Sequence, residues 1–172
     1  QRILFIGLPC QVSAVKNFID GEAEKNLYTV DLICHGTPSP EMLEVFLKQY
    51  NRSLVDMEDI RFRTKAKFHV YDGSRGIVTN GVTDRYSIAF LHALIYTENC
   101  YDCPYAAKAR ISDLTLGDSW GSELALEEQK KGISLALCQT KKGIELLDSA
   151  RLLLEPVVPD RAIASNHQLR HP

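Results

Sequence analysis

The chain has 172 residues, of which 45% are hydrophobic and 24% are charged, and its formal net charge is -2. This length is enough for one domain with a hydrophobic core. The small net charge gives no indication of a nucleic-acid partner or an anionic membrane surface. No apolar run approaches the roughly 20 residues that span a bilayer. We therefore expect a single domain over residues 1–172 with no nucleic-acid partner and no membrane span.

The ends of the sequence indicate a fragment of a longer polypeptide. It begins with Gln1 rather than Met, a predicted strand starts almost at once, and Ser165–Pro172 is polar. No signal-peptide pattern is present, so we expect a cytoplasmic location. In that compartment, five cysteines favour reduced thiols or metal ligation over disulfides. Cys138 lies inside an apolar run and is predicted to be a buried core residue.

The first fifty residues alternate between apolar strands and amphipathic helices. Strands are predicted at Ile3–Gly7 and Leu27–Ile33, and a helix at Gln11–Ile19 from its apolar spacing. A second helix begins at Ser39-Pro40-Glu41, which combines an N-cap serine, a first-turn proline and an acid. This β-α-β-α order predicts parallel strands joined by crossover helices.

The middle of the chain has a different pattern, with short strands and turn signals. We predict an antiparallel meander and then a short apolar helix at Ile88–Tyr96. The predicted strands are Asp59–Thr64, Val70–Tyr71, Gly76–Thr79 and Arg85–Ser87, with turns at Asp72-Gly73 and Asn80-Gly81.

The last third returns to an α/β pattern. It predicts strands at Ile111–Leu116 and Ile133–Cys138, a helix from Thr140 through Arg151, and an extended segment at Glu155–Pro159. The predicted fold class is therefore mixed α/β, with a partly parallel sheet, flanking helices and an antiparallel meander insertion.

Four cysteines carry the main chemical signal. Cys10 follows the first predicted strand, Cys34 follows the second, and Cys100 and Cys103 form a C-x-x-C motif. The carboxyl ends of neighbouring parallel strands lie at one sheet edge, where ligands bind. A thiol at a helix N-terminus, as expected for Cys10, is favoured as thiolate. Four such thiolates are the ligand set of a [4Fe–4S] cluster.

Other interpretations of these cysteines remain open. His35 beside Cys34 allows a zinc site, although structural zinc sites usually use two local pairs. Thiol chemistry fits less well, because this C-x-x-C follows a helix and precedes Pro104. Absence of any site is the third alternative.

Two further segments have both a binding and a structural interpretation. Gly117-Asp118-Ser119-Trp120-Gly121 could present backbone and a stacking ring to a flat ligand, or could be a tight turn around a buried tryptophan. The lysines at 131 and at 141–142 could bind phosphate, but Thr140 as an ordinary N-cap is the favoured interpretation. A basic strand edge is formed by four residues: Arg61, Arg63, Lys65 and Lys67. Protection of that edge against aggregation explains these charges as well as anion binding does.

Five motifs in order resemble the C-terminal domain of the coenzyme F420 hydrogenase/dehydrogenase beta subunit family. They are Gly-Leu-Pro-Cys-Gln, Val-Asp-Leu-Ile-Cys-His-Gly-Thr-Pro-Ser-Pro, Cys-Tyr-Asp-Cys-Pro-Tyr, Ser-Asp-Leu-Thr-Leu-Gly-Asp-Ser-Trp-Gly and Lys-Gly-Ile-Ser-Leu-Ala-Leu. The resemblance covers roughly Ile3 to Arg151. It implies an oxidoreductase that holds a [4Fe–4S] cluster and a flavin, with FAD favoured over FMN.

The resemblance also implies particular site residues and partners. Cys10, Cys34, Cys100 and Cys103 correspond to cluster ligands, and Asp118, Trp120, Lys131 and Ser134 to the flavin or substrate region. Electrons would pass between a ferredoxin-like domain or protein, the cofactors and a small organic acceptor such as coenzyme F420, within a homo- or hetero-oligomer. The dense cysteine runs of the family's ferredoxin-like part do not occur here. The alternative function is a zinc-stabilised or metal-free scaffold in a larger assembly.

Overall fold

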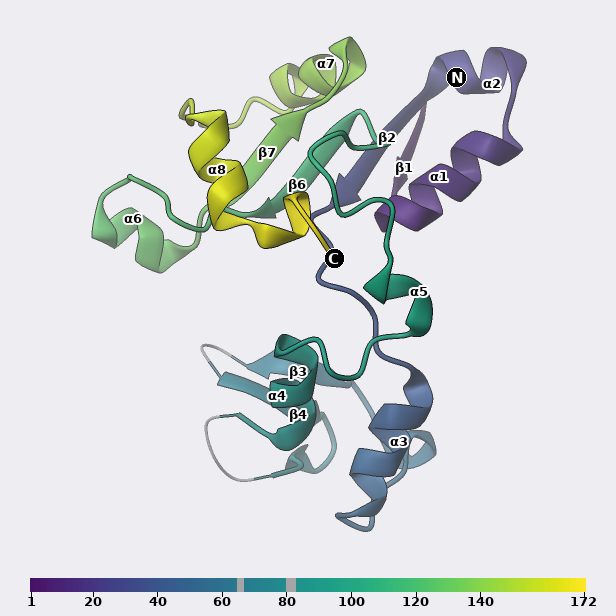
Figure 1. Cartoon of the computed structure of the whole chain (residues 1–172), viewed down its shortest axis with the longest axis vertical. Helices are drawn as coiled ribbons and strands as arrows, with labels where there is room; N and C mark the ends of the chain where they lie inside the picture. The colour runs from purple at the N-terminus through teal and green to yellow at the C-terminus, as the bar shows by residue number, and fades with distance from the viewer. Residues whose placement is uncertain (65–66, 80–82) are drawn as a thin grey trace. The chain divides into compact units, whose positions relative to one another are not determined.

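The computed structural model describes residues 1–64, 67–79 and 83–172 of the chain (Figure 1). They form two compact units: unit 1 contains Gln1–His35 and Cys103–Pro172, and unit 2 contains Gly36–Asp102. Unit 1 is built on a mixed sheet with helices, and unit 2 on a small antiparallel sheet with helices. The predicted mixed α/β fold class is confirmed.

The sheet of unit 1 has the strand order β1-β2-β6-β7. Its strands are β1 (Ile3–Ile6), β2 (Leu27–Leu32), β6 (Leu114–Asp118) and β7 (Ser134–Cys138). β1 pairs with β2 and β2 pairs with β6 in parallel, whereas β7 runs antiparallel to β6. The predicted parallel pairing of the first two strands is confirmed, and it brings three carboxyl ends to one edge of the sheet.

Helices surround this sheet, as Figure 1 shows for unit 1. They are α1 (Pro9–Phe18), α2 (Gly21–Asn26), α6 (Leu126–Lys131), α7 (Lys141–Ser149), α8 (Pro159–Ser165) and the 3-10 turn η2 (His167–Leu169). α1 packs against β2 and α7 packs against β2 and β6. The unit's core consists of buried apolar side chains from the strands, α1 and the C-terminal segment: Val12, Leu27, Val30, Leu114, Leu135, Ala162 and Leu169.

One prediction for the core of unit 1 is wrong. Cys138 is exposed rather than buried, because it is the last residue of β7, the strand at the end of the sheet. Residues 155–158 belong to no helix or strand, and the unpredicted helix α8 begins at Pro159, the last residue of the predicted extended segment. A proline at the first helical position already has the backbone angle that a helix requires, and the sequence pattern alone did not reveal the helix that follows.

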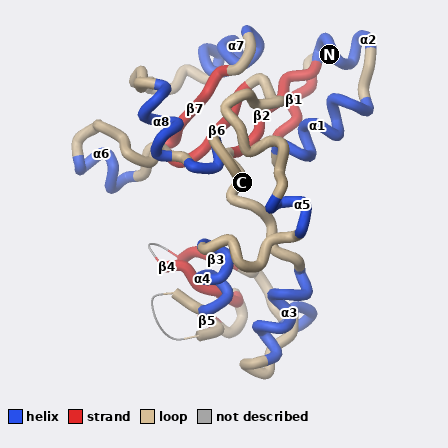
Figure 2. The backbone as a smooth tube through the Cα atoms, in the orientation of Figure 1, coloured by secondary structure: helices blue, strands red, loops and turns tan. Residues whose placement is uncertain are grey.

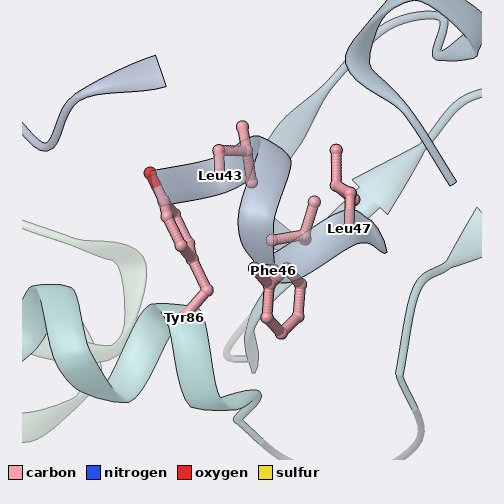
Figure 3. Packing of buried hydrophobic residues seen from close by; sticks show 5 residues of the cluster. Leu43, Phe46, Leu47 and Tyr86 are labelled. Carbon is pink, nitrogen blue, oxygen red and sulfur yellow. The ribbon is translucent and has the colours of Figure 1, made fainter. Parts of the chain in front are cut away.

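Unit 2 combines the antiparallel sheet β3-β4-β5 with helices (Figure 2). Its elements are α3 (Pro40–Lys48), the 3-10 turn η1 (Leu54–Asp56), β3 (Arg61–Thr64), β4 (Lys67–Asp72), β5 (Gly76–Ile77), α4 (Arg85–Leu91) and α5 (Glu98–Tyr101). The predicted meander is confirmed over its first three strands. The core joins α3 to the sheet and α4 through Leu43, Phe46, Leu47, Val70 and Tyr86 (Figure 3).

In unit 2, one predicted turn is confirmed and one predicted strand is wrong. Asp72 accepts hydrogen bonds from the Ser74 N–H at 2.9 Å and hydroxyl at 2.7 Å, which confirms the turn after β4. The predicted strand Arg85–Ser87 is wrong, because Asp84 caps the N-terminus of α4 by accepting from the Ser87 N–H at 2.7 Å. The predicted Asn80-Gly81 turn and Lys65 lie outside the described residues.

Across residues 1–64, 67–79 and 83–172, no helix is both long enough and apolar enough to cross a membrane.

Candidate cofactor site at the carboxyl edge of the sheet

Cys10 and Cys34 occupy equivalent positions beyond two paired strands. Ile6 of β1 and Val30 of β2 are register partners, and each cysteine lies four positions further along its own chain segment. Because the two strands are parallel, both segments leave the sheet at the same edge. The sheet therefore directs these two predicted ligands toward one side of unit 1.

Cys10 is the second residue of α1, directly after Pro9. Its side chain is exposed, and the first turn of a helix carries N–H groups without helical partners. The start of α1 is fixed by the Leu8 N–H, which donates to the Gln11 side-chain oxygen at 2.8 Å. A thiol in this position is accessible to a ligand.

The segment containing Cys103 is joined to the end of β2 by Arg110. The guanidinium group donates to the carbonyl oxygen of Tyr105 and, at 2.7 Å, to that of Leu32. Tyr105 lies two positions after Cys103, and Leu32 two positions before Cys34. One buried side chain therefore links the two backbone segments that carry these predicted ligands. Sequence reasoning missed Arg110.

Arg110 is held in turn by Asp31, the next-to-last residue of β2. The Nη2 and Oδ2 atoms lie 3.3 Å apart, and the two side chains are 1% and 0% exposed. An isolated charge in such a place is costly, so a buried carboxylate requires a cationic partner. The one sequence signal that could have revealed the pair is an aspartate within a largely apolar strand.

Cys100 belongs to unit 2, where it lies in the short helix α5. Its sulfur is 3.3 Å from the Thr97 hydroxyl oxygen. The backbone that precedes α5 pairs with the segment after Cys34: the Thr97 N–H donates to the Thr37 carbonyl oxygen at 2.8 Å, and Tyr96 forms a β-bridge with Pro38.

Gly36 of the Cys-His-Gly-Thr-Pro motif is required by this packing. Its φ angle is +104°, and a Cβ atom there would lie 2.7 Å from the ring of Tyr96. Both the backbone angle and the close approach of the ring exclude larger residues. The motif thus has a structural explanation in addition to its cysteine.

The residues predicted for the flavin or substrate region lie at the same sheet edge as Cys10 and Cys34. Asp118, the last residue of β6, is the register partner of Ser134, the first residue of β7. Trp120 follows β6 and is 58% exposed, which excludes the buried-tryptophan interpretation. Lys131 ends α6, and its Nζ donates to Glu128 at 2.7 Å.

The two glycines around this loop are explained by internal packing. A Cβ on Gly117 would lie 2.6 Å from the Ile33 side chain. Gly121 has a φ angle of +69°, and a Cβ there would lie 2.3 Å from the Ser165 hydroxyl oxygen. The glycines therefore admit neighbouring side chains of unit 1, and Trp120 remains the exposed flat surface of the loop.

The lysines beside Thr140 have a structural explanation as well. Thr140 is the N-cap of α7, and its hydroxyl oxygen accepts from the Gly143 N–H at 3.3 Å. Lys142 donates to the Leu27 carbonyl oxygen at 2.8 Å and lies over the Tyr28 ring. This confirms the favoured interpretation of the segment as an ordinary helix start.

The C-terminal segment covers part of the same edge. The Gln168 side-chain amide donates to Nδ1 of His35 at 2.5 Å, and the His35 and His167 rings make an edge contact with centroids 5.8 Å apart. Arg161 of α8 forms an ion pair with Glu123, in the segment after β6. Residues 159–171 are thereby attached to the loops that follow β2 and β6. Sequence reasoning did not predict these contacts.

All five cysteines lie in described residues and none forms a disulfide. Within the described part of the chain, no group of three or more His, Cys, Asp or Glu side chains is arranged to hold a metal ion. The donor chemistry of four reduced cysteines nevertheless matches the all-thiolate ligand set of an iron–sulfur cluster. The ligand roles of these cysteines remain predictions.

Comparison with known protein families shows which family this chain belongs to. Residues 1–155 match the family described as coenzyme F420 hydrogenase/dehydrogenase, C terminus of the beta subunit. The chain belongs to this family. The resemblance inferred from the five sequence motifs is therefore confirmed, and so is the assignment to a family of oxidoreductase subunits.

A solved structure has a similar fold. It is a chain of the F420-reducing [NiFe] hydrogenase complex from Methanosarcina barkeri, which aligns with a TM-score of 0.52 and 23% sequence identity. The alignment covers 87% of this chain and 48% of that one, so the present chain spans about half the length of this relative. No curated protein matches the chain.

Proposed function

We propose that this chain is the cluster-binding and flavin-binding part of a beta subunit that transfers electrons to a small organic acceptor. The single observation that supports it most is the equivalent placement of Cys10 and Cys34 beyond register-paired residues, in a member of this family. When bound, a [4Fe–4S] cluster supplies one-electron transfer, and a flavin couples one-electron to two-electron steps.

In this proposal the ligands are Cys10, Cys34, Cys100 and Cys103. Arg110 supports the site by holding the backbone around Cys103 against the end of β2.

The flavin is proposed to lie along the loops at the ends of β6 and β7. The exposed ring of Trp120 offers a stacking surface, and Asp118 and Ser134 offer polar groups at neighbouring strand ends. Lys131 is available to a phosphate, because its ion pair with Glu128 is exposed and therefore weak. FAD is favoured over FMN. Coenzyme F420 or another small redox molecule is the proposed acceptor, with a ferredoxin-like domain or protein as electron partner.

The cluster is tested by purification without oxygen, followed by iron, zinc and acid-labile sulfide analysis and a visible spectrum. We expect about four irons and four sulfides per chain from this site. Cys34→Ser should abolish them, whereas Cys138→Ser, which alters an exposed cysteine outside the ligand set, should not. Stoichiometric zinc, or no metal, would overturn the proposal and favour a structural module.

The flavin is tested by fluorescence, because Trp120 is the chain's only tryptophan. Titration with FAD and with FMN should quench its emission in a saturable manner, and the tighter of the two curves identifies the flavin. Trp120→Phe should retain part of the affinity through its ring, and Trp120→Ala should lose it. Equal flavin affinity for Trp120→Ala, measured by equilibrium dialysis, would remove Trp120 from the proposed site.

A further inference from the structure

Thr97 has an unusual hydrogen-bonding arrangement for its position. It is the N-cap of α5, where a threonine hydroxyl normally accepts a hydrogen bond from a backbone N–H of the first turn. Here its side chain makes no such bond. The hydroxyl oxygen lies 3.3 Å from the sulfur of Cys100 instead. The Thr97 hydroxyl therefore contacts a predicted cluster ligand and does not cap the helix.

The backbone fixes this contact. The Cys100 N–H donates to the Thr97 carbonyl oxygen at 2.9 Å, and the Thr97 N–H donates to Thr37 at 2.8 Å. The Tyr96 N–H donates to the Tyr101 hydroxyl at 3.1 Å. Thr97 and Cys100 are both half-buried. These hydrogen bonds fix the backbone of residues 96–101, and this backbone keeps the Thr97 hydroxyl close to the Cys100 sulfur.

The direction of the hydrogen bond follows from protonation. With a neutral thiol, either atom can be the donor. A metal-bound cysteine is a thiolate and has no proton to give, so the hydroxyl must donate. Hydrogen bonds to cluster sulfurs are one of the factors that set reduction potentials. Donation stabilises the added negative charge of the reduced state more than it stabilises the oxidised state, and so raises the potential.

We propose that Thr97 is a positioning residue for Cys100, and that its hydroxyl raises the reduction potential of the cluster by donating to the ligand sulfur. This inference rests on the proposed role of Cys100 as a cluster ligand. It adds a specific control of the electron-transfer step by a residue outside the ligand set.

The test compares Thr97→Val with Thr97→Ser in the full chain, purified without oxygen. Valine keeps the shape of threonine but removes the hydroxyl, and serine keeps the hydroxyl. The measurements are the midpoint potential from a redox titration followed by electron paramagnetic resonance, and the iron–sulfur stretching frequencies from resonance Raman spectra. Thr37→Val, which removes an exposed hydroxyl from the paired segment, is the matched control.

We expect a lower midpoint potential and shifted stretching frequencies for Thr97→Val only, with wild-type values for Thr97→Ser and Thr37→Val. Iron and sulfide content should be equal in all four proteins. Equal content with an unchanged potential in Thr97→Val, or an equal shift in Thr97→Ser, would overturn this inference and leave the proposed function intact. Absence of iron and sulfide from the wild type would overturn both.

Discussion

Asp31 and Arg110 form a buried ion pair with their charged atoms 3.3 Å apart, and Arg110 also binds the carbonyl oxygens at Leu32 and Tyr105. The pair thus joins a strand of the sheet to a loop far away in the sequence. Removing one member of a buried pair leaves an uncompensated charge and is more damaging than removing both. This asymmetry allows the structural and the ligand-positioning roles of the pair to be separated.

Arg110→Met should therefore destabilise the protein and lower its iron and sulfide content several-fold. The double variant Asp31→Leu/Arg110→Met should recover much of the thermal stability, because no buried charge is left, yet should not recover the iron. Lys108→Met, at an exposed neighbouring position, is the control. Thermal unfolding and iron analysis of the same samples test this. Wild-type iron content in the double variant would contradict the positioning role.

Asp84→Ala should destabilise unit 2. Its two carboxylate oxygens accept from the Ser87 N–H at 2.7 Å and from the Val70 N–H at 2.5 Å, so one buried side chain caps α4 and joins it to β4. Loss of a cap and of a buried charge-assisted hydrogen bond is expected to cost about 2–4 kcal/mol. Denaturant unfolding should show this loss, whereas the exposed Asp56→Ala should change stability by less than about 0.5 kcal/mol. A similar result for both variants would contradict the prediction.

Asp113 should make the stability of the protein depend on acidic pH. Burial raises the pKa of Asp113, but hydrogen bonds from Thr140 and from the side chain and backbone of Thr29 oppose it, and the net direction is below the ordinary value. Those bonds are 2.7, 2.8 and 2.8 Å long. A lowered folded-state pKa contributes stability above the unfolded-state pKa, roughly 3.9, which is lost as the pH falls through the folded-state value.

We therefore expect wild type to exceed Asp113→Asn in unfolding midpoint at pH 7, with a difference that shrinks below about pH 4. Unfolding of both proteins at matched pH values gives this difference directly. A difference that stays constant down to about pH 3, below the ordinary aspartate pKa, would show that the Asp113 charge is not the source.

Gly117→Ala should destabilise unit 1, since the new methyl group would lie 2.6 Å from Cδ1 of Ile33. Overpacking of this kind costs about 1–3 kcal/mol. Ile33→Val removes the nearest atom, so the double variant Gly117→Ala/Ile33→Val should be more stable than Gly117→Ala alone. Additive losses in the double variant, measured by denaturant unfolding, would show that the two side chains do not compete for one space.

The sequence was most informative where hydrophobic periodicity and turn chemistry agreed. The apolar runs before Cys10 and Cys34 predicted two parallel strands, and from them the equivalent positions of the two cysteines. Thr140 was correctly predicted as an N-cap because threonine is common at that position. The exposed Trp120 was a candidate, but its exposure could not be predicted from a loop motif alone.

Other features depend on contacts between distant residues. The charge of Asp31 signals a partner, but nothing in the local sequence identifies Arg110. Arg85–Ser87 resembles a strand in its residue types, yet the Asp84 cap makes it a helix. α6 lacks an apolar face and carries exposed ion pairs such as Lys130 with Glu127, so hydrophobic periodicity could not detect it.

The contact between Gln168 and His35 has a practical consequence for protein production. The matched family range stops at residue 155, so a recombinant version trimmed to that boundary would discard the partners of His35 and Glu123. It would also lose Leu169, which is fully buried. Such a truncated product would expose apolar surface that the buried Leu169 and Ala162 cover, and it should aggregate during purification.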